Sequence, residues 1–133
     1  VALPQQHVLA QQKMITADEL PSDELLLLSE GHCLREHALS ACNLPSTRQR
    51  TSVQGTSLTT LIEMVAGGLG LTLIPEMALH SDIVKRNDIS LRPFTNKNDT
   101  PMRELGLVWR HSYSREATID VLSQHFANAL IES

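Results

Sequence analysis

Apolar and polar stretches alternate along the chain, and their order predicts strands that are followed by helices. The apolar run at residues 24–28 is short and lies between turn-forming residues, which favours a buried strand. Residues 32–41 contain no glycine or proline and carry small or apolar side chains on one face, which predicts a helix. A second short strand is expected at residues 49–54.

A second helix is expected to begin at Thr56 or Ser57, because either hydroxyl can cap it and apolar residues then recur at helical spacing. Glycines from Gly67 onward stop this helix. The other expected elements are a short helix at 17–20, strands at 69–74, 89–94 and 104–109, a helical turn at 76–80, and a helix that Ser114 caps. This alternation predicts an α/β fold in which parallel strands are joined by right-handed crossovers and covered by helices.

The composition is that of a single globular domain, with 133 residues of which 41% are hydrophobic and 20% charged. The net charge is −4 and no aromatic residue precedes Phe94, which argues against direct nucleic-acid binding through cationic side chains or stacked bases. No apolar run approaches the roughly 20 residues that cross a bilayer, and no signal-peptide pattern opens the chain. We therefore expect a cytoplasmic protein without a membrane partner.

The two cysteines lie at opposite ends of the helix predicted at residues 32–41. Cys33 falls in its first turn, where unpaired N–H groups and the helix dipole favour the thiolate, and the neighbouring His32 and Arg35 favour it further. Cys42 follows nine positions later, roughly 13 Å along the helix axis and on its opposite side. A disulfide between these two residues therefore requires the helix to unwind.

Three interpretations of this pair stay open at the level of the residues. A reactive Cys33 thiolate can be oxidised by peroxide and then joined to Cys42, with residues 34–41 rearranging. Composition alone favours two inert, buried cysteines. A zinc site made of His32, Cys33, His37 and Cys42 is disfavoured, because Cys42 faces away from the others and no CxxC pair is present.

The glycine-rich stretch MVAGGLGLTLIP lacks the ending of a phosphate-binding loop, and its glycines follow a helix instead of preceding one. The helix start at Thr56 and Ser57 is a weaker candidate for anion binding, at the edge of a pocket. The histidines show no pattern with serine and aspartate that would define a catalytic triad.

Three stretches, GHCLREHALSAC, TSLTTLIEMVAGGLGLTLIP and PMRELGLVWR, resemble the regulatory domain of the LysR-type transcription factors. The motif GHCLRE with a second cysteine nine positions on is similar to that of the peroxide-sensing members of the family. The resemblance spans about residues 7–131 and implies a periplasmic-binding-protein-like effector domain made of two Rossmann-like α/β subdomains, truncated here. It divides the chain into a connection from the missing part of subdomain I (1–13), subdomain II with the redox cysteines (14–103), and a strand and helix that return to subdomain I (104–133).

The resemblance also implies roles for individual residues. Cys33 matches the cysteine that hydrogen peroxide oxidises, and Cys42 matches the one that resolves it to a disulfide. His32 matches the histidine beside the reactive thiol, and Arg103 matches an arginine that stabilises the reduced-state thiolate. Neither a metal nor a cofactor is implied, and the expected role is sensing and not enzymatic turnover.

The expected partners are hydrogen peroxide, further copies of the chain in a homodimer or homotetramer, and RNA polymerase in the intact activator. DNA would be bound only through a winged helix-turn-helix domain that is absent here. The apolar faces of residues 104–109 and 114–131 should be exposed or packed against another chain. The alternatives are an effector domain that binds a small acidic inducer near Thr56 and Ser57, with incidental cysteines, and a thiol peroxidase, for which no CxxC motif is present.

Overall fold

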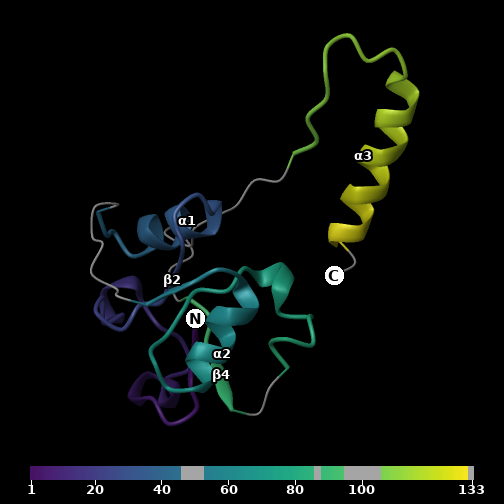
Figure 1. Ribbon diagram of the computed structural model, residues 1–133. Helices are drawn as coiled ribbons and strands as arrows, with labels where there is room; N and C mark the ends of the chain where they lie inside the picture. The colour runs from purple at the N-terminus through teal and green to yellow at the C-terminus, as the bar shows by residue number, and fades with distance from the viewer. Residues whose placement is uncertain (46–52, 86–87, 95–105, 132–133) are drawn as a thin grey trace. The chain divides into compact units, whose positions relative to one another are not determined.

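The computed structural model describes residues 1–45, 53–85, 88–94 and 106–131, and the chain divides into two compact units, Val1–Met102 and Arg103–Ser133 (Figure 1). The first unit contains β1 (Ala2–Pro4), η1 (Val8–Gln11), η2 (Ala17–Glu19), β2 (Leu27–Leu28), α1 (Cys33–Ala41), β3 (Gln54–Gly55), α2 (Leu58–Ala66), η3 (Glu76–Ala78) and β4 (Ile89–Leu91). The second unit contains α3 (Glu116–Ile131). Strands and helices alternate as the α/β prediction requires.

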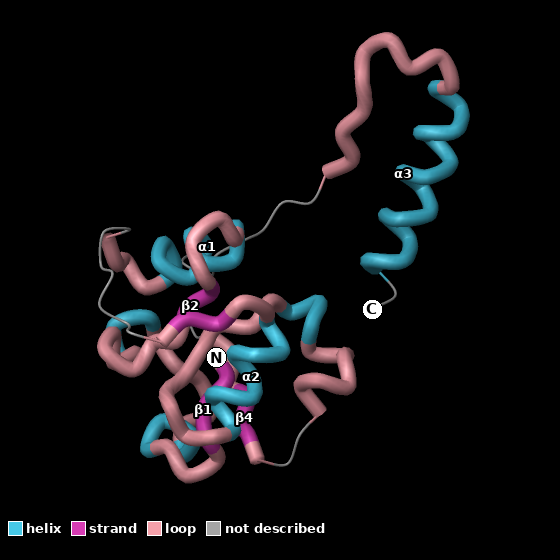
Figure 2. Tube along the Cα trace, viewed as in Figure 1, coloured by secondary structure: helices cyan, strands magenta, loops and turns pink. Residues whose placement is uncertain are grey.

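The strands of the first unit form two short pairs, drawn in magenta in Figure 2. β2 and β3 run parallel, with Leu27 opposite Gln54, as expected for strands that a crossover helix, α1, connects. β1 and β4 run antiparallel, with Leu3 opposite Ser90. The prediction that all strands run parallel is therefore wrong for β1 and β4. No single crossover helix connects these two strands, so their relative direction is not constrained.

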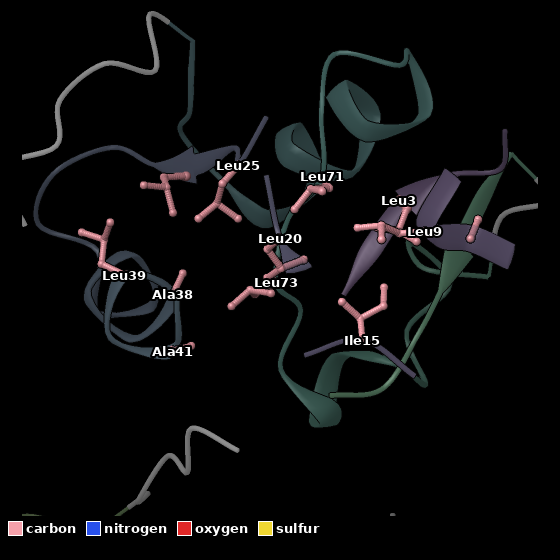
Figure 3. Packing of buried hydrophobic residues seen from close by; sticks show 12 residues of the cluster. Leu3, Leu9, Ile15, Leu20, Leu25, Ala38, Leu39, Ala41, Leu71 and Leu73 are labelled. Atoms are coloured by element: carbon pink, nitrogen blue, oxygen red, sulfur yellow. The ribbon is translucent and has the colours of Figure 1, made fainter. Parts of the chain in front are cut away.

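The segment around β2 is apolar on both faces because a helix packs against each face. Its residues alternate between two buried clusters, as side chains of a strand do. One cluster includes residues of α1 and contains Leu3, Leu9, Ala10, Ile15, Leu20, Leu25, Leu27, Ala38, Leu39, Ala41, Leu71 and Leu73 (Figure 3). The other includes residues of α2 and contains Ala2, Leu26, Leu28, Leu61, Ile62, Val65, Val84 and Ile89.

Several predicted elements are shorter than expected. The segment expected as a strand at residues 69–74 pairs only through single bridges at Leu71 and Thr72. Of the strand expected at 49–54, residues 49–52 lie outside the described residues, and β3 begins at Gln54. Glycine is required at Gly70, since a Cβ atom there would lie 2.2 Å from the carbonyl oxygen of Glu24.

Residues 1–13, expected to be a connection, contain β1 and η1 and take part in the core of the first unit. Ala2 and Leu3 are fully buried. The Arg92 side chain donates hydrogen bonds to the carbonyl oxygens of Ala10 at 2.5 Å and Gln12 at 2.7 Å. These bonds tie the end of η1 to the chain that follows β4 and satisfy carbonyl groups that the short helix leaves unpaired.

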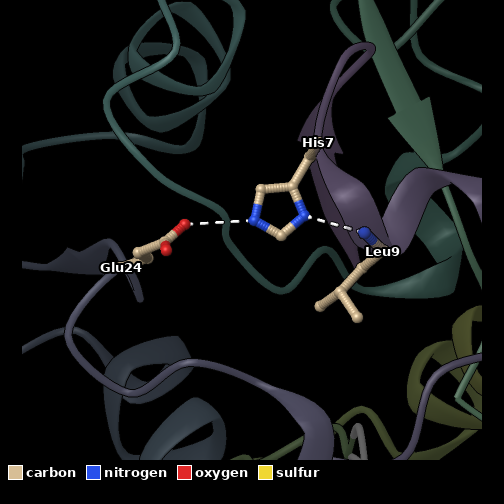
Figure 4. Close-up of polar contacts among 3 residues, drawn as sticks. All are labelled: His7, Leu9 and Glu24. Atoms are coloured by element: carbon tan, nitrogen blue, oxygen red, sulfur yellow. Dashed lines mark hydrogen bonds and ion pairs between the residues drawn. The ribbon is translucent and has the colours of Figure 1, made fainter.

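His7 links the start of η1 to the segment that precedes β2 (Figure 4). Its Nδ1 accepts the backbone N–H of Leu9 at 3.1 Å, so that this nitrogen carries no proton. Nε2 then carries the proton of the neutral ring and donates to Glu24 Oε2, also at 3.1 Å. Both ring nitrogens of His7 are therefore used in local structure.

In the second unit, residues 106–109 are not a strand, so the prediction of a strand at 104–109 is wrong where the structure describes it. No other strand of the described part pairs with this segment, and an isolated strand has no hydrogen-bonded neighbour to stabilise it.

α3 begins at Glu116, two residues beyond the predicted cap at Ser114. Among the described residues of this unit, large apolar side chains are exposed at Leu107, Val108, Trp109, Tyr113, Val121, Leu122 and Phe126, as the sequence predicted for these segments. No helix in the described ranges has both the length and the apolar character to cross a membrane.

Candidate functional site

Cys33 is the first residue of α1 and is exposed to solvent. His32 precedes it as the N-cap residue in an extended conformation, and the His32 side chain is exposed and makes no capping hydrogen bond. The Cys33 sulfur therefore lies where the helix dipole favours negative charge and where a small oxidant can reach it. The predicted juxtaposition of these two residues at a helix N-terminus is confirmed.

Cys42 is the C-cap residue of the same helix and is only half-buried. Its N–H donates to the carbonyl oxygen of Ala38 at 3.2 Å, and its side chain packs against the cluster that includes α1. Burial raises the pKa of the Cys42 thiol above its usual range, because the thiolate is less well solvated there than in water. Near neutral pH this residue is a protonated thiol.

The two cysteines are held apart by the helix between them. α1 contains nine residues from Cys33 to Ala41, and Cys42 follows at its end, so the two Cα atoms are separated by roughly 13 Å along the axis. A disulfide needs Cα atoms within about 7 Å of each other. Neither cysteine is in a disulfide, and none can form between them while α1 stays helical.

Arg35 does not take the position beside the thiolate that its sequence neighbourhood suggested. It is 3% exposed, and its Nη1 donates to the carbonyl oxygen of Leu28 in β2 at 3.1 Å. Side chains two positions apart on a helix point in directions that differ by about 200°. The buried Arg35 therefore lies on the opposite face of α1 from the exposed Cys33. We therefore correct its role: Arg35 anchors α1 to β2.

The other predicted site residues are Arg103, Thr56 and Ser57. Arg103 lies outside the described residues. Thr56 and Ser57 are exposed at the start of α2. The Ser57 hydroxyl accepts the N–H of Thr60 at 3.1 Å and lies 3.0 Å from the Thr60 hydroxyl, so it serves as the helix cap.

A metal site was disfavoured by the sequence. In the part of the chain that the structure describes, no three His, Cys, Asp or Glu side chains are grouped closely enough to hold a metal ion. His32, Cys33, His37 and Cys42 all belong to this part, so they do not form such a group.

The chain leaves α1 at Asn43, which follows Cys42 directly. Asn43 adopts a left-handed backbone conformation, with φ of 50°. The N–H of Asn43 donates to the Ser40 carbonyl at 3.1 Å, and the N–H of Leu44 donates to the Leu39 carbonyl at 2.9 Å. These two bonds form a Schellman motif directly after Cys42. The signal in the sequence was the residue type, since asparagine is the commonest alternative to glycine at this position.

Comparison with known proteins relates this chain to bacterial transcription regulators. Residues 1–130 match the family described as the LysR substrate binding domain. The HTH-type transcriptional regulator EstR of Acinetobacter baylyi is 41% identical over 105 residues, which cover 79% of this chain and 34% of EstR. A probable hydrogen peroxide-inducible genes activator of Mycobacterium avium is 39% identical over 117 residues, which cover 87% of this chain and 37% of the activator.

A solved structure extends the comparison to three dimensions. The reduced form of the OxyR regulatory domain from Pseudomonas aeruginosa matches with a TM-score of 0.78 at 35% identity. The match covers 92% of this chain and 57% of that domain. The chain spans about a third of the length of the two curated relatives and somewhat more than half of the solved domain.

Proposed function

Because this chain belongs to the LysR substrate-binding domain family, we propose that it is the redox-sensing part of a peroxide-responsive transcription regulator. The M. avium relative is named as a hydrogen peroxide-inducible activator, and the P. aeruginosa domain has the same fold. The observation that carries the proposal is the placement of two thiols at opposite ends of one helix. Cys33 is exposed and Cys42 is half-buried, so peroxide reaches the first before the second.

The proposed reaction has two steps. The Cys33 thiolate attacks one oxygen of hydrogen peroxide, the O–O bond breaks, and the departing hydroxide takes up a proton to leave as water. The Cys42 thiol then attacks the sulfur of the Cys33 sulfenic acid, the S–O bond breaks, and a second water leaves as the disulfide forms. Two thiols are oxidised and one peroxide is reduced. Because the thiols cannot meet across an intact α1, residues 34–41 must refold in the second step.

We further propose that Arg103 lies near the Cys33 thiolate in the whole protein and stabilises its charge, with His32 beside it. The first unit would form the redox subdomain, including residues 1–13 that were expected to be a connection. Residues 104–133 would return to a neighbouring subdomain that covers the exposed apolar side chains of the second unit. In the intact cytoplasmic activator, the refolding would alter how subunits of a homodimer or homotetramer sit on DNA and contact RNA polymerase.

A second candidate is an effector domain that binds a small acidic inducer near Thr56 and Ser57, with incidental cysteines. This candidate is supported by EstR, which is 41% identical and is named as a transcriptional regulator without mention of peroxide. Against it, the Ser57 hydroxyl is already engaged by the N–H and hydroxyl of Thr60. A thiol peroxidase is a third candidate, and repeated turnover with thioredoxin as reductant would distinguish it from a stoichiometric sensor.

The test is a titration of the reduced chain with hydrogen peroxide, followed by thiol counting and peptide mapping. We expect two thiols to be lost per peroxide, a Cys33–Cys42 disulfide, and a drop in helical circular dichroism. Cys42→Ser should stop at a sulfenic acid on Cys33 that dimedone traps, and Cys33→Ser should keep its remaining thiol. An unmodified Cys33 at stoichiometric peroxide, or a disulfide with unchanged helix content, would contradict the proposal.

A further inference from the structure

Helices α1 and α2 are both nine residues long and end in the same hydrogen-bonding pattern. After α2, the N–H of Gly68 donates to the Val65 carbonyl at 2.9 Å, and the N–H of Leu69 donates to the Met64 carbonyl at 3.0 Å. These bonds correspond one for one to those that Asn43 and Leu44 make after α1. The chain thus contains two Schellman motifs that differ in the residue at the left-handed position.

That residue is Gly68 after α2, with φ of 76°, and Asn43 after α1, with φ of 50°. A left-handed backbone brings the Cβ of an L-residue close to the following carbonyl oxygen, and only glycine escapes this contact. Asparagine tolerates the conformation better than other non-glycine residues, yet it retains part of the steric cost. The end of α1 is therefore held less firmly than the end of α2.

The weaker of the two motifs lies next to the cysteine that must move. Cys42 is the C-cap residue, and Asn43 follows it directly. Forming the Cys33–Cys42 disulfide would break the two hydrogen bonds of the motif and release Asn43 from its left-handed conformation. It would also separate Leu39 from Leu44, which pack in the same cluster. The steric cost at Asn43 raises the free energy of the helical dithiol state alone, so it favours the disulfide.

We propose that Asn43 is a positioning residue that sets how readily Cys33 and Cys42 form their disulfide, by ending α1 with a weaker stop than glycine gives α2. This inference rests on the proposed function. The side chain of Asn43 is exposed, and no step of the proposed reaction uses it. It would nevertheless set the ratio of glutathione disulfide to glutathione at which half of the chains contain the Cys33–Cys42 disulfide.

The test is a redox titration of the 133-residue chain in mixtures of glutathione and glutathione disulfide. In this exchange the two protein thiols give two electrons to glutathione disulfide, whose S–S bond breaks, and one protein disulfide and two glutathione thiols form. The equilibrium constant of this reaction is measured for the unaltered chain and for Asn43→Ala, Asn43→Gly and Gly68→Ala. Gly68→Ala is the matched control, since its added Cβ meets no atom within 4 Å and changes only the left-handed strain.

We expect Asn43→Ala to raise the equilibrium constant for disulfide formation about fivefold, and Asn43→Gly to lower it by a smaller factor. Gly68→Ala should lower the stability of the fold in urea without moving the equilibrium constant, because α2 is helical in both redox states. If Asn43→Ala lowers stability but leaves the equilibrium constant unchanged, or if Gly68→Ala shifts it equally, the role of Asn43 is overturned. The complete absence of a Cys33–Cys42 disulfide in the unaltered chain would instead overturn the proposed function, and the role of Asn43 with it.

Discussion

Helices α1 and α2 have equal length but are stabilised by different means. α2 begins at Ser57, whose hydroxyl accepts the N–H of Thr60, and is followed by Gly68 in the left-handed conformation. The N-cap residue of α1 is His32, whose side chain makes no capping bond, and the left-handed residue after this helix is Asn43. Each such difference at a helix end is worth about 1 kcal/mol. Together they make the two ends of α1 less stable than those of α2.

Tertiary contacts compensate for the weak ends of α1. Ala38, Leu39 and Ala41 are buried in the cluster that also contains Leu25 and Leu27 (Figure 3). Arg35 reaches across to the Leu28 carbonyl of β2. The helix is therefore folded because it is packed, while its ends contribute little. An element of this kind is suited to a two-state switch, since one covalent bond between its ends can outweigh its local stability.

The largest expected effects come from emptying the core beneath each helix. Leu39→Ala in α1 and Ile62→Ala in α2 each remove a side chain that is at most 2% exposed. Each should lower the free energy of unfolding of the dithiol chain by about 2–5 kcal/mol. In the disulfide form we expect Ile62→Ala to keep its full cost in stability. Leu39→Ala should lose most of its cost, because the refolding that we propose for residues 34–41 would already remove Leu39 from the core.

Urea unfolding of both redox forms of both variants measures this difference. An equal cost of Leu39→Ala in the dithiol and disulfide forms would show that α1 stays packed after oxidation, and the contrast between the two helices would then disappear.

Arg35 provides the next largest effect. Arg35→Met should lower the stability of the dithiol form by about 1–3 kcal/mol, because a buried carbonyl oxygen loses its donor. It should also favour the disulfide, since the proposed refolding of α1 would break this bond in the disulfide form. Arg92→Met is a matched control, in which an arginine that donates to the Ala10 and Gln12 carbonyls away from α1 is replaced.

Arg92→Met should destabilise both redox forms alike, as judged by urea unfolding. Glutathione titrations should therefore separate the two arginines, with a shift for Arg35→Met alone. Equal shifts would mean that Arg35 contributes to general stability and not to the switch.

Much of the contrast between the helices could be predicted from the sequence, because local patterns encode it. The apolar spacing after Ser57 and the absence of glycine and proline in residues 32–41 predicted both helices, and Ser57 was named as a possible cap. The positions of Cys33 and Cys42 at the two ends of α1 followed from the helix bounds alone. Local rules suffice where the determinant lies within one turn of the residue concerned.

The rest could not be predicted because it depends on distant parts of the chain. Arg35 was assigned to the thiolate from sequence proximity, yet its partner is a carbonyl seven residues earlier in β2. The antiparallel pairing of β1 with β4 joins residues nearly ninety positions apart, beyond any local pattern. Residues 106–109 have the composition of a strand, but a strand forms only where another strand offers its hydrogen bonds.

The helix N-termini give smaller effects of opposite sign. Ser57→Ala removes the cap of α2 and should lower the free energy of unfolding by about 1 kcal/mol. His32→Ser supplies a cap that α1 lacks and should raise the stability of the dithiol form by about 0.5–1 kcal/mol. In glutathione buffer His32→Ser should disfavour the disulfide, whereas Ser57→Ala should leave the equilibrium unchanged. A stabilisation by His32→Ser that is equal in both redox forms would contradict the unwinding of α1.

The smallest effect concerns pH and separates the C-terminal ends of the two helices. The C-cap residue of α1 is Cys42, which titrates, whereas that of α2 is Gly67, which does not. Burial raises the pKa of the Cys42 thiol, so the folded chain holds this proton more tightly than the unfolded chain. Above the ordinary thiol pKa of about 8.5 the unfolded chain loses the proton first, and the dithiol form should lose stability as the pH rises. Cys42→Ala should abolish this alkaline loss, while Cys33→Ala should retain it. Urea midpoints between pH 7 and 10 measure the difference, and an alkaline loss that persists in Cys42→Ala would show that another group is responsible.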